Sequence, residues 1–371
     1  RMSACTEDGF LKGLSMHISR LKLIHFRNYE QLNIEFYPGI NVLYGKNAQG
    51  KTNILEAINI CANGKSFRVS PDTKTITEGK EGAYLYTEYI EKEKRSVEVL
   101  IARDKKKSIK VDGIPAKKLK ELLGNMYVVV FSPEDMKTAK EAPSLRRAFL
   151  DGEISKIRPS YVDALKQYTK IIAQKNAALR HKTDKNLKNI LSAYNEQLCG
   201  YIKIILKNRK AYVKKLNECV ASTHRAIAGN DENITIEYKE TIPENDIKGA
   251  LARNIGREIS DGCTSAGPHR DDMEILINKK DIRVFASQGQ LRTLMLAIKT
   301  ACLKILAEST SCVPVLLLDD VFAELDAIRK ENLLNTLKGI QVFLTTADEN
   351  AAHIAGAHLF YVQNGRIESK R

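Results

Sequence analysis

The sequence has no tryptophan, only nine prolines among its 371 residues, and aromatic side chains at 6%. Hydrophobic residues still make up 43% and charged residues 28%, a globular balance that excludes bulk disorder and collagen-like repeats. No apolar run approaches the ~18 residues of a membrane-spanning helix, and the N-terminus lacks the hydrophobic stretch of a signal peptide. The length suggests two or three domains, or one domain with a large insertion.

Paired cysteines are also missing. The seven cysteines are scattered and form no C-x-x-C pair, at Cys5, Cys61, Cys199, Cys219, Cys263, Cys302 and Cys312. An odd number at wide spacing is typical of reduced thiols rather than of a disulfide framework or a zinc site. We therefore expect a cytoplasmic protein that does not bind a membrane.

Acidic residues are too few to balance the basic ones, and the formal net charge is +14. Most of the excess lies between Lys156 and Lys215, where fifteen basic residues face three acidic ones. In the same stretch apolar residues recur at steps of three and four, which predicts two long antiparallel helices forming a short coiled-coil arm. Its lysines, among them Lys203, Lys207 and Lys210, are either a solvated helix face or a track for DNA phosphates.

A glycine-rich loop follows the last of three predicted strands, at residues 17–24, 31–36 and 40–44. It reads Gly45-Lys46-Asn47-Ala48-Gln49-Gly50-Lys51-Thr52 and precedes a helical apolar pattern. The pattern G-x-x-x-x-G-K-T between a strand and a helix is that of a phosphate-binding loop, or P-loop, rather than a plain glycine turn. Its N–H groups would face phosphates, Lys51 would reach the β- and γ-phosphates, and Thr52 would ligate Mg²⁺.

Near the other end, an apolar run at 313–318 ends in Asp319 and Asp320. A buried strand that carries carboxylates at its C-terminal end is how P-loop folds hold magnesium. We expect Asp319 to belong to the Mg²⁺ shell and Asp320 to polarise the attacking water. Asp320 and Lys51, which would reach the phosphates, are therefore the candidate catalytic residues.

Three further segments resemble motifs of the ABC ATPase superfamily. Ser287-Gln288-Gly289-Gln290 resembles the signature motif, which serves the nucleotide of the opposite subunit, although Gln288 replaces a glycine. Ala323-Glu324-Leu325-Asp326 stands in the position of the D-loop, where Glu324 and Asp326 are the candidates. Thr346 stands where transporters carry a switch histidine, so we expect slow hydrolysis.

The spacing of these motifs predicts the architecture. From Thr52 to Ser287 there are 235 positions, too many for a transporter ATPase and too few for an SMC protein with full coiled-coil arms. We therefore expect an α/β fold: an ABC/SMC-type P-loop ATPase head with an inserted α-helical lobe that carries a short antiparallel coiled coil.

The chain resembles the RecF family of bacterial recombination mediators across residues 16–371. The shared blocks are Phe26-Arg27-Asn28-Tyr29, the P-loop, Phe131-Ser132-Pro133-Glu134-Asp135, the segments 146–151 and 264–272, and Leu318 through Asp326. The expected division is a segment 1–15 outside the resemblance, head halves at 16–150 and 236–371, and the helical arm lobe at 151–235.

The resemblance implies an ATP-dependent homodimer that binds DNA and takes part in DNA repair and replication. It would act with RecR and RecO to help RecA load at single-strand gaps, and in SOS induction. Arg27 would reach the nucleotide, while Lys65 and Arg68 could meet DNA phosphates or belong to an ordinary basic loop. Two alternatives stay open: another SMC-like repair ATPase, or a scaffold that uses ATP only to dimerise. His269 to Asp272 lack a further metal ligand at helix or strand spacing and are expected to form a structured loop.

Overall fold

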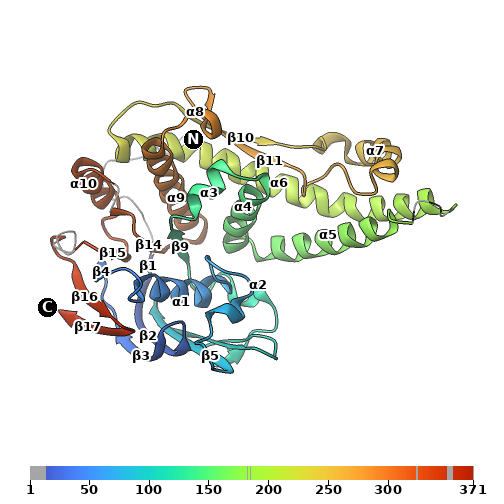
Figure 1. Ribbon diagram of the computed structural model, residues 1–371. Coiled ribbons are helices and arrows are strands. Elements are labelled where there is room, and N and C mark those ends of the chain that lie inside the picture. The colour runs from blue at the N-terminus through green and yellow to red at the C-terminus, as the bar shows by residue number, and fades with distance from the viewer. Residues whose placement is uncertain (1–13, 182, 184, 323–324, 349–353, 371) are drawn as a thin grey trace. The chain divides into compact units, whose positions relative to one another are not determined.

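The computed structural model describes residues 14–181, 183, 185–322, 325–348 and 354–370. These residues belong to two compact units (Figure 1). The first comprises the chain up to Met136, the segment Cys219–Glu232 and the chain from Ser287, and the second comprises Lys137–Glu218 and Asn233–Ala286. The division expected from the sequence does not coincide with these units, because its boundaries fall inside helix α4 (Pro143–Ile157) and strand β10 (Ile234–Lys239).

The first unit contains a six-stranded sheet whose order is β17-β16-β4-β15-β14-β9. All neighbouring strands run parallel except β17, which is antiparallel to β16. The bounds are β4 Ile40–Tyr44, β9 Val128–Phe131, β14 Val315–Leu318, β15 Val342–Thr346, β16 His358–Gln363 and β17 Arg366–Lys370. Strands β4 and β14 are the two that the sequence predicts before the P-loop and before the aspartate pair, and they lie in one sheet.

A second six-stranded sheet in the same unit is antiparallel, in the order β3-β2-β5-β6-β7-β8. The bounds are β2 His17–Phe26, β3 Tyr29–Glu35, β5 Gly82–Ile90, β6 Lys94–Ala102, β7 Ser108–Val111 and β8 Ile114–Pro115. Alternating burial along β5 and β6 reflects the alternation of apolar and polar residues in the sequence. A short parallel pair, β1 (Leu14–Ser15) with β13 (Cys312–Val313), completes the strands of this unit.

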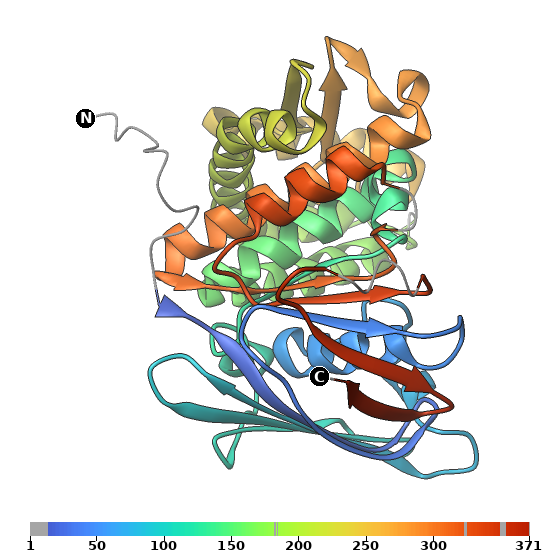
Figure 2. The ribbon, with the colours of Figure 1, turned by 90° about the vertical axis from the view of Figure 1, so that its left-hand side faces the viewer.

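Helix α1 (Lys51–Asn63) lies between the two sheets (Figure 2). Its apolar residues Ile54, Leu55 and Ile58 are fully buried in one cluster with Leu43 of the parallel sheet and Leu85 of the antiparallel sheet. Helix α9 (Gln288–Thr310) contacts strands β9 and β13. The remaining helices of this unit are α2 (Leu119–Leu122), α10 (Ala327–Thr336) and the 3₁₀ turn η1 (Asp72–Thr75). Helix α3 (Asp135–Lys140) begins in this unit, whose first segment ends at Met136. Burial of α1 on both sides fixes the loop at its N-terminus in a rigid frame.

The second unit is built around a helical hairpin of α5 (Pro159–Ala178) and α6 (Leu187–Ala228), as the apolar spacing predicts (Figure 1). The last ten residues of α6, from Cys219, belong to the first unit. The second unit also holds α4, α7 (Ile247–Asp261), α8 (Ile282–Phe285), the turn η2 (Glu244–Asp246) and a sheet in the order β10-β11-β12, with β11 at Asp272–Ile277 and β12 at Lys280–Asp281. Among the described residues, no helix is both long and apolar enough to cross a bilayer.

Four of the basic residues counted in this region do not form a free surface track. Arg209 is 2% exposed, and its guanidinium donates two 2.9 Å hydrogen bonds to the carboxylate of Asp151. Lys175 is fully buried, with its Nζ 2.7 Å from a carboxylate oxygen of Glu258. Lys156 and Lys210 are also held in ion pairs, and Lys182 lies outside the described residues. The exposed basic residues of the stretch are Arg158, Lys166, Lys170, Arg180, Lys185, Lys188, Lys203, Lys207, Lys214 and Lys215.

Candidate functional site

The glycine-rich loop connects β4 to α1, as its sequence predicts. Gly45 and Gly50 have φ angles of 141° and 114°, in a region that favours glycine. A Cβ at Gly45 would lie 2.4 Å from the carbonyl oxygen of Val362, and one at Gly50 would lie 2.8 Å from the hydroxyl of Tyr29. Both glycines are therefore required by backbone conformation and by the close approach of neighbouring groups.

The side chain of Lys51 folds back over this loop. Its Nζ donates hydrogen bonds to the carbonyl oxygens of Gly45 and Lys46, at 2.6 and 2.8 Å. Burial lowers the pKa of Lys51, and the nearby charges of Asp320 and Asp319 oppose that shift. An ammonium group thus lies within the curve of the loop, close to two carboxylates from the other end of the chain.

Thr52 and the aspartate pair meet at the ends of α1 and β14. The Thr52 hydroxyl donates a 2.7 Å hydrogen bond to Oδ1 of Asp319, and the Thr345 hydroxyl donates a second one of 2.8 Å to the same oxygen. Burial raises the pKa of Asp319, while these two hydrogen bonds lower it. Thr345 also accepts a hydrogen bond from the backbone N–H of Asp320, whose φ is 50° and whose side chain is exposed. The four residues form one connected cluster.

A turn between β2 and β3 braces the outer side of the loop. The Asn28 amide donates to the carbonyl oxygen of Gln49 at 2.9 Å, and the Tyr29 hydroxyl donates to that of Gly50 at 3.1 Å. Arg27 does not point into open solvent, since its guanidinium makes hydrogen bonds of 2.8 and 2.7 Å to the two carboxylate oxygens of Glu56, a fully buried residue of α1. The sequence alone does not reveal this anchoring of the arginine that was expected to reach a nucleotide.

Arg68 is exposed, but its side chain also contacts helix α1. Its guanidinium donates a 3.0 Å hydrogen bond to the Asn53 side chain and lies 3.7 Å from the carboxylate of Glu56. Lys65, the other candidate in this segment, is exposed. Of the two expected DNA contacts, Lys65 is open to a ligand, whereas Arg68 is shared with the first turns of α1.

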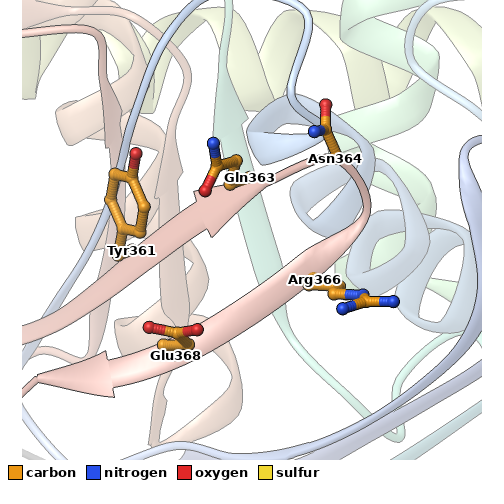
Figure 3. Close-up of a pocket in the computed structure, with 5 residues that line it drawn as sticks. All are labelled: Tyr361, Gln363, Asn364, Arg366 and Glu368. Atoms are coloured by element: carbon orange, nitrogen blue, oxygen red, sulfur yellow. The ribbon is translucent and has the colours of Figure 1, made fainter.

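A cavity of about 400 Å³ lies on the β16–β17 hairpin (Figure 3). The tip of this hairpin touches the P-loop, because the N–H of Asn364 donates a 2.8 Å hydrogen bond to the Gln49 side chain. The lining side chains are polar or charged, and none of them was a candidate from the sequence: Tyr361, Gln363, Asn364, Arg366 and Glu368. The hairpin thus supports the loop from the side of β4.

The signature-like residues form the first turn of α9. Ser287 is the N-cap residue, and its hydroxyl accepts a 3.2 Å hydrogen bond from the N–H of Gln290. Gln290 returns a bond by accepting the N–H of Ser287 at 3.0 Å, which completes a capping box. Ser287, Gln288 and Gly289 are exposed. A serine hydroxyl and a helix N-terminus are therefore presented at the surface.

The two D-loop candidates have different outcomes. Asp326 caps α10, since its carboxylate accepts a 2.8 Å hydrogen bond from the N–H of Arg329. Glu324 lies outside the described residues.

Thr346, in the position of the switch histidine, is buried, and its hydroxyl accepts a hydrogen bond from the N–H of Asp348 at 3.1 Å. Within the described parts of the chain, no group of three or more His, Cys, Asp or Glu residues could hold a metal.

The sequence reasoning also missed two residues that position the motif residues. Thr345 is the penultimate residue of β15, which pairs with β14, the strand that precedes Asp319, and the sequence singled out only its neighbour Thr346. Glu56 interrupts the apolar face of α1, and a lone carboxylate among Ile54, Leu55 and Ile58 was a sign of a buried ion pair.

A protein-family model described as the RecF/RecN/SMC N terminal domain matches residues 17–368. The DNA replication and repair protein RecF of Clostridium novyi (strain NT) is 42% identical over 362 residues, which cover 95% of this chain and 99% of the relative. The chain belongs to the RecF family. RecF of Alkaliphilus oremlandii (strain OhILAs) is 39% identical over 368 residues, which cover 95% and 100% of the two chains.

Solved structures agree with this assignment. The structure of the recombination mediator protein RecF-ATP in the RecFOR pathway has a TM-score of 0.89 at 34% identity and covers 99% of this chain and 100% of its own. An Smc head domain with an extended coiled coil from Pyrococcus furiosus has a TM-score of 0.56 at 17% identity, which shows the fold alone. The predicted SMC-type head with an inserted helical lobe is therefore confirmed.

Proposed function

We propose that this RecF-family chain binds ATP with Mg²⁺ in the loop from Gly45 to Thr52 and hydrolyses it slowly while acting in DNA repair. The observation that carries the proposal is the 2.7 Å hydrogen bond between Thr52 and Asp319, which joins the end of the P-loop to the aspartate pair. The solved structure described as RecF-ATP, which is 34% identical to this chain, supports the same assignment. A P-loop next to a strand-end aspartate is the arrangement that P-loop NTPases use.

Phosphate binding requires a rearrangement of one side chain. Lys51 must exchange its hydrogen bonds to the loop carbonyls for bonds to phosphate oxygens, while the backbone N–H groups at the start of α1 face the same phosphates. The Thr52 hydroxyl and the Asp319 carboxylate are the oxygen donors that Mg²⁺ takes, and the ion would neutralise phosphate charge there. The donor set fits an ion completed by phosphate and water oxygens.

For hydrolysis we assign Asp320 to the attacking water. Its side chain is exposed, and Thr345 fixes its backbone. The residue in the switch-histidine position, Thr346, is buried and engaged with the backbone, so it offers no imidazole to the γ-phosphate. A slow reaction follows from that difference.

ATP would also close a homodimer in which Ser287 of one copy meets the nucleotide of the other. The signature turn is exposed, and large apolar side chains stand beside it and beside Asp326 in the sequence: Val284 is 73% exposed, Phe285 64% and Ile328 70%. Exposed apolar side chains near the motifs fit burial against a second copy. ATP that binds the closed dimer more tightly than the monomer would increase the population of the dimer by mass action.

We further propose that the dimer binds DNA and acts with RecR and RecO to promote RecA loading and SOS induction. Relatives named as DNA replication and repair proteins, and as a mediator in the RecFOR pathway, support this role. Exposed lysines of the helical hairpin, such as Lys203 and Lys207, supply positive charge without a base-reading motif. The matches of about 40% identity favour RecF over another SMC-like repair ATPase.

The non-hydrolysing scaffold is the alternative favoured by Gln288 and Thr346, which depart from the motifs of active ABC ATPases. Phosphate release by the wild type and by Asp320→Asn, measured with and without DNA, separates the two. If the chain is an enzyme, the wild type should release phosphate slowly, and the rate should fall at least tenfold in the variant. Equal, negligible rates in both proteins would support the scaffold.

A further inference from the structure

Glu232 lies between the signature turn and the C-terminal end of helix α6. One of its carboxylate oxygens accepts a 2.7 Å hydrogen bond from the side-chain amide of Gln290. The other lies 3.5 Å from Nε2 of His224, a residue of α6. All three residues belong to the first unit, and the sequence pattern assigns Glu232 and His224 no role.

Among the described residues, His224 donates no hydrogen bond to the Glu232 carboxylate, which therefore relies on the hydrogen bond from Gln290. His224 is fully buried, and among the described residues neither of its ring nitrogens has a hydrogen-bond partner. Burial lowers the pKa of His224, with Glu232 opposing that shift and Arg329 adding to it. Glu232 is 17% exposed, so its charge is partly desolvated, and among the described residues the Gln290 amide is the group that donates a hydrogen bond to it.

This contact fixes the orientation of the Gln290 amide. A carboxylate can only accept hydrogen bonds, so the NH₂ group of Gln290 must face Glu232. The amide oxygen of Gln290 then faces the N–H of Ser287 and accepts it at 3.0 Å. The orientation of a single amide thereby determines how the signature serine is held at the start of α9.

We propose that Glu232 is a positioning residue for the signature turn, and that through Glu232 the end of helix α6 bears on the presentation of Ser287. The proposal rests on the proposed function, in which Ser287 serves the nucleotide of a second copy. Helix α6 is continuous from Leu187 to Ala228, and its earlier part belongs to the basic hairpin. Glu232 follows α6 closely in the chain and lies 3.5 Å from His224 of that helix, so a change at the end of α6 reaches the signature turn through Glu232 and its hydrogen bond to Gln290.

An exchange of the two side chains tests the pairing. Gln290→Glu alone places two carboxylates against each other, so it should expel the side chain from Glu232 and lower ATP-driven dimer association about tenfold. Glu232→Gln alone retains an acceptor for Gln290 and should stay within about threefold of the wild type. In the double variant Glu232→Gln/Gln290→Glu, residue 290 accepts both the new amide and the Ser287 N–H, so association should recover.

Two measurements on the full chain distinguish this inference from the proposed function. Hydrogen exchange at the Ser287 amide, followed without nucleotide, should be fast in Gln290→Glu and slow again in the double variant. Sedimentation with ATP and Mg²⁺ reports dimer association. Binding of a fluorescent ATP analogue to the monomer, measured at protein concentrations too low for dimers, should be the same in all variants. A double variant no better than Gln290→Glu in exchange overturns the positioning role. Restored exchange without restored association overturns its link to the dimer.

Discussion

The Thr52 hydroxyl and the Asp319 carboxylate are 267 positions apart in the sequence and 2.7 Å apart in the structure. Thr345 donates to the same carboxylate oxygen from a third segment. The two threonines thus make equivalent contacts to Asp319, yet only Thr52 belongs to the phosphate-binding loop. They form a natural pair for separating metal binding from the positioning of Asp319 and Asp320.

Replacing each threonine by valine, which removes the hydroxyl and keeps the shape, should give different defects. Thr52→Val should weaken Mg²⁺-dependent ATP binding at least tenfold, because it removes a proposed metal ligand. Thr345→Val should preserve most of the ATP affinity and lower the hydrolysis rate about tenfold, because the N–H of Asp320 loses its acceptor. Titration of a fluorescent ATP analogue and phosphate release measure the two effects. The same defect in both variants would contradict separate roles.

Charge reversal at two exposed lysines of the helical hairpin tests the DNA track. Lys203→Glu/Lys207→Glu should weaken DNA binding and reduce the slope of log affinity against log salt concentration by about 2, if each lysine contacts one phosphate. Lys105→Glu/Lys106→Glu, on an exposed β-hairpin turn, changes the net charge equally and serves as the control. Equal effects of the two pairs would leave only a general charge effect. Lys210 is unsuitable for this test, because it already pairs with Glu244.

Removal of Asp151 should destabilise the second unit strongly. Among the described residues, Asp151→Ala leaves the buried guanidinium of Arg209 with neutral partners, namely Tyr161, Tyr238 and the carbonyl oxygen of Pro268. Breaking one side of such a pair typically costs about 3–5 kcal/mol. Urea unfolding of Asp151→Ala beside the exposed control Lys207→Ala, expected within about 0.5 kcal/mol of the wild type, measures it. A loss below about 1 kcal/mol would show that the pair contributes little.

The sequence predicts the head more completely than the lobe. The P-loop and the apolar run before Asp319 carry strong local patterns, and the structure has a strand–loop–helix segment and a buried strand where these patterns place them. The burial of Arg209 and Lys175 could not be predicted, because their partners Asp151 and Glu258 are far away in the sequence. A helical period identifies a face, but it does not reveal that another helix will cover part of that face.

The same limit applies to Glu56, Thr345 and Glu232. Each residue acts through hydrogen bonds or ion pairs to residues of other elements, and such contacts appear only when the elements are assembled. The motif residues Lys51, Thr52 and Asp319 were predictable because their spacing along the chain is itself the signal. The residues that position them have no characteristic spacing along the chain that would identify them.

His269 should make stability depend on pH. Burial lowers its pKa to about 4, and its two ring nitrogens lie near the hydroxyls of Tyr168 and Thr264. The unfolded chain, with a histidine pKa near 6.5, binds a proton that the folded chain resists, so this contribution is complete above pH 6.5 and declines toward pH 4. The loss is about 3 kcal/mol at most.

Urea unfolding between pH 4.5 and pH 8 should therefore show a smaller dependence on pH for His269→Asn than for the wild type. The comparison of slopes, rather than of absolute stabilities, isolates the titration, because the substitution also removes packing. Identical slopes in the two proteins would mean that His269 does not carry this dependence.

Sedimentation velocity with and without ATP and Mg²⁺ tests the central claim most directly, with Ser287→Arg, the surface control Ser108→Arg and Lys51→Met beside the wild type. The wild type and Ser108→Arg should become dimers when ATP is added. Ser287→Arg should bind ATP and remain a monomer, because its serine acts on the nucleotide of a second copy, and Lys51→Met should lose both properties. A wild-type chain that binds ATP and stays monomeric at saturating ATP and Mg²⁺ would contradict the account.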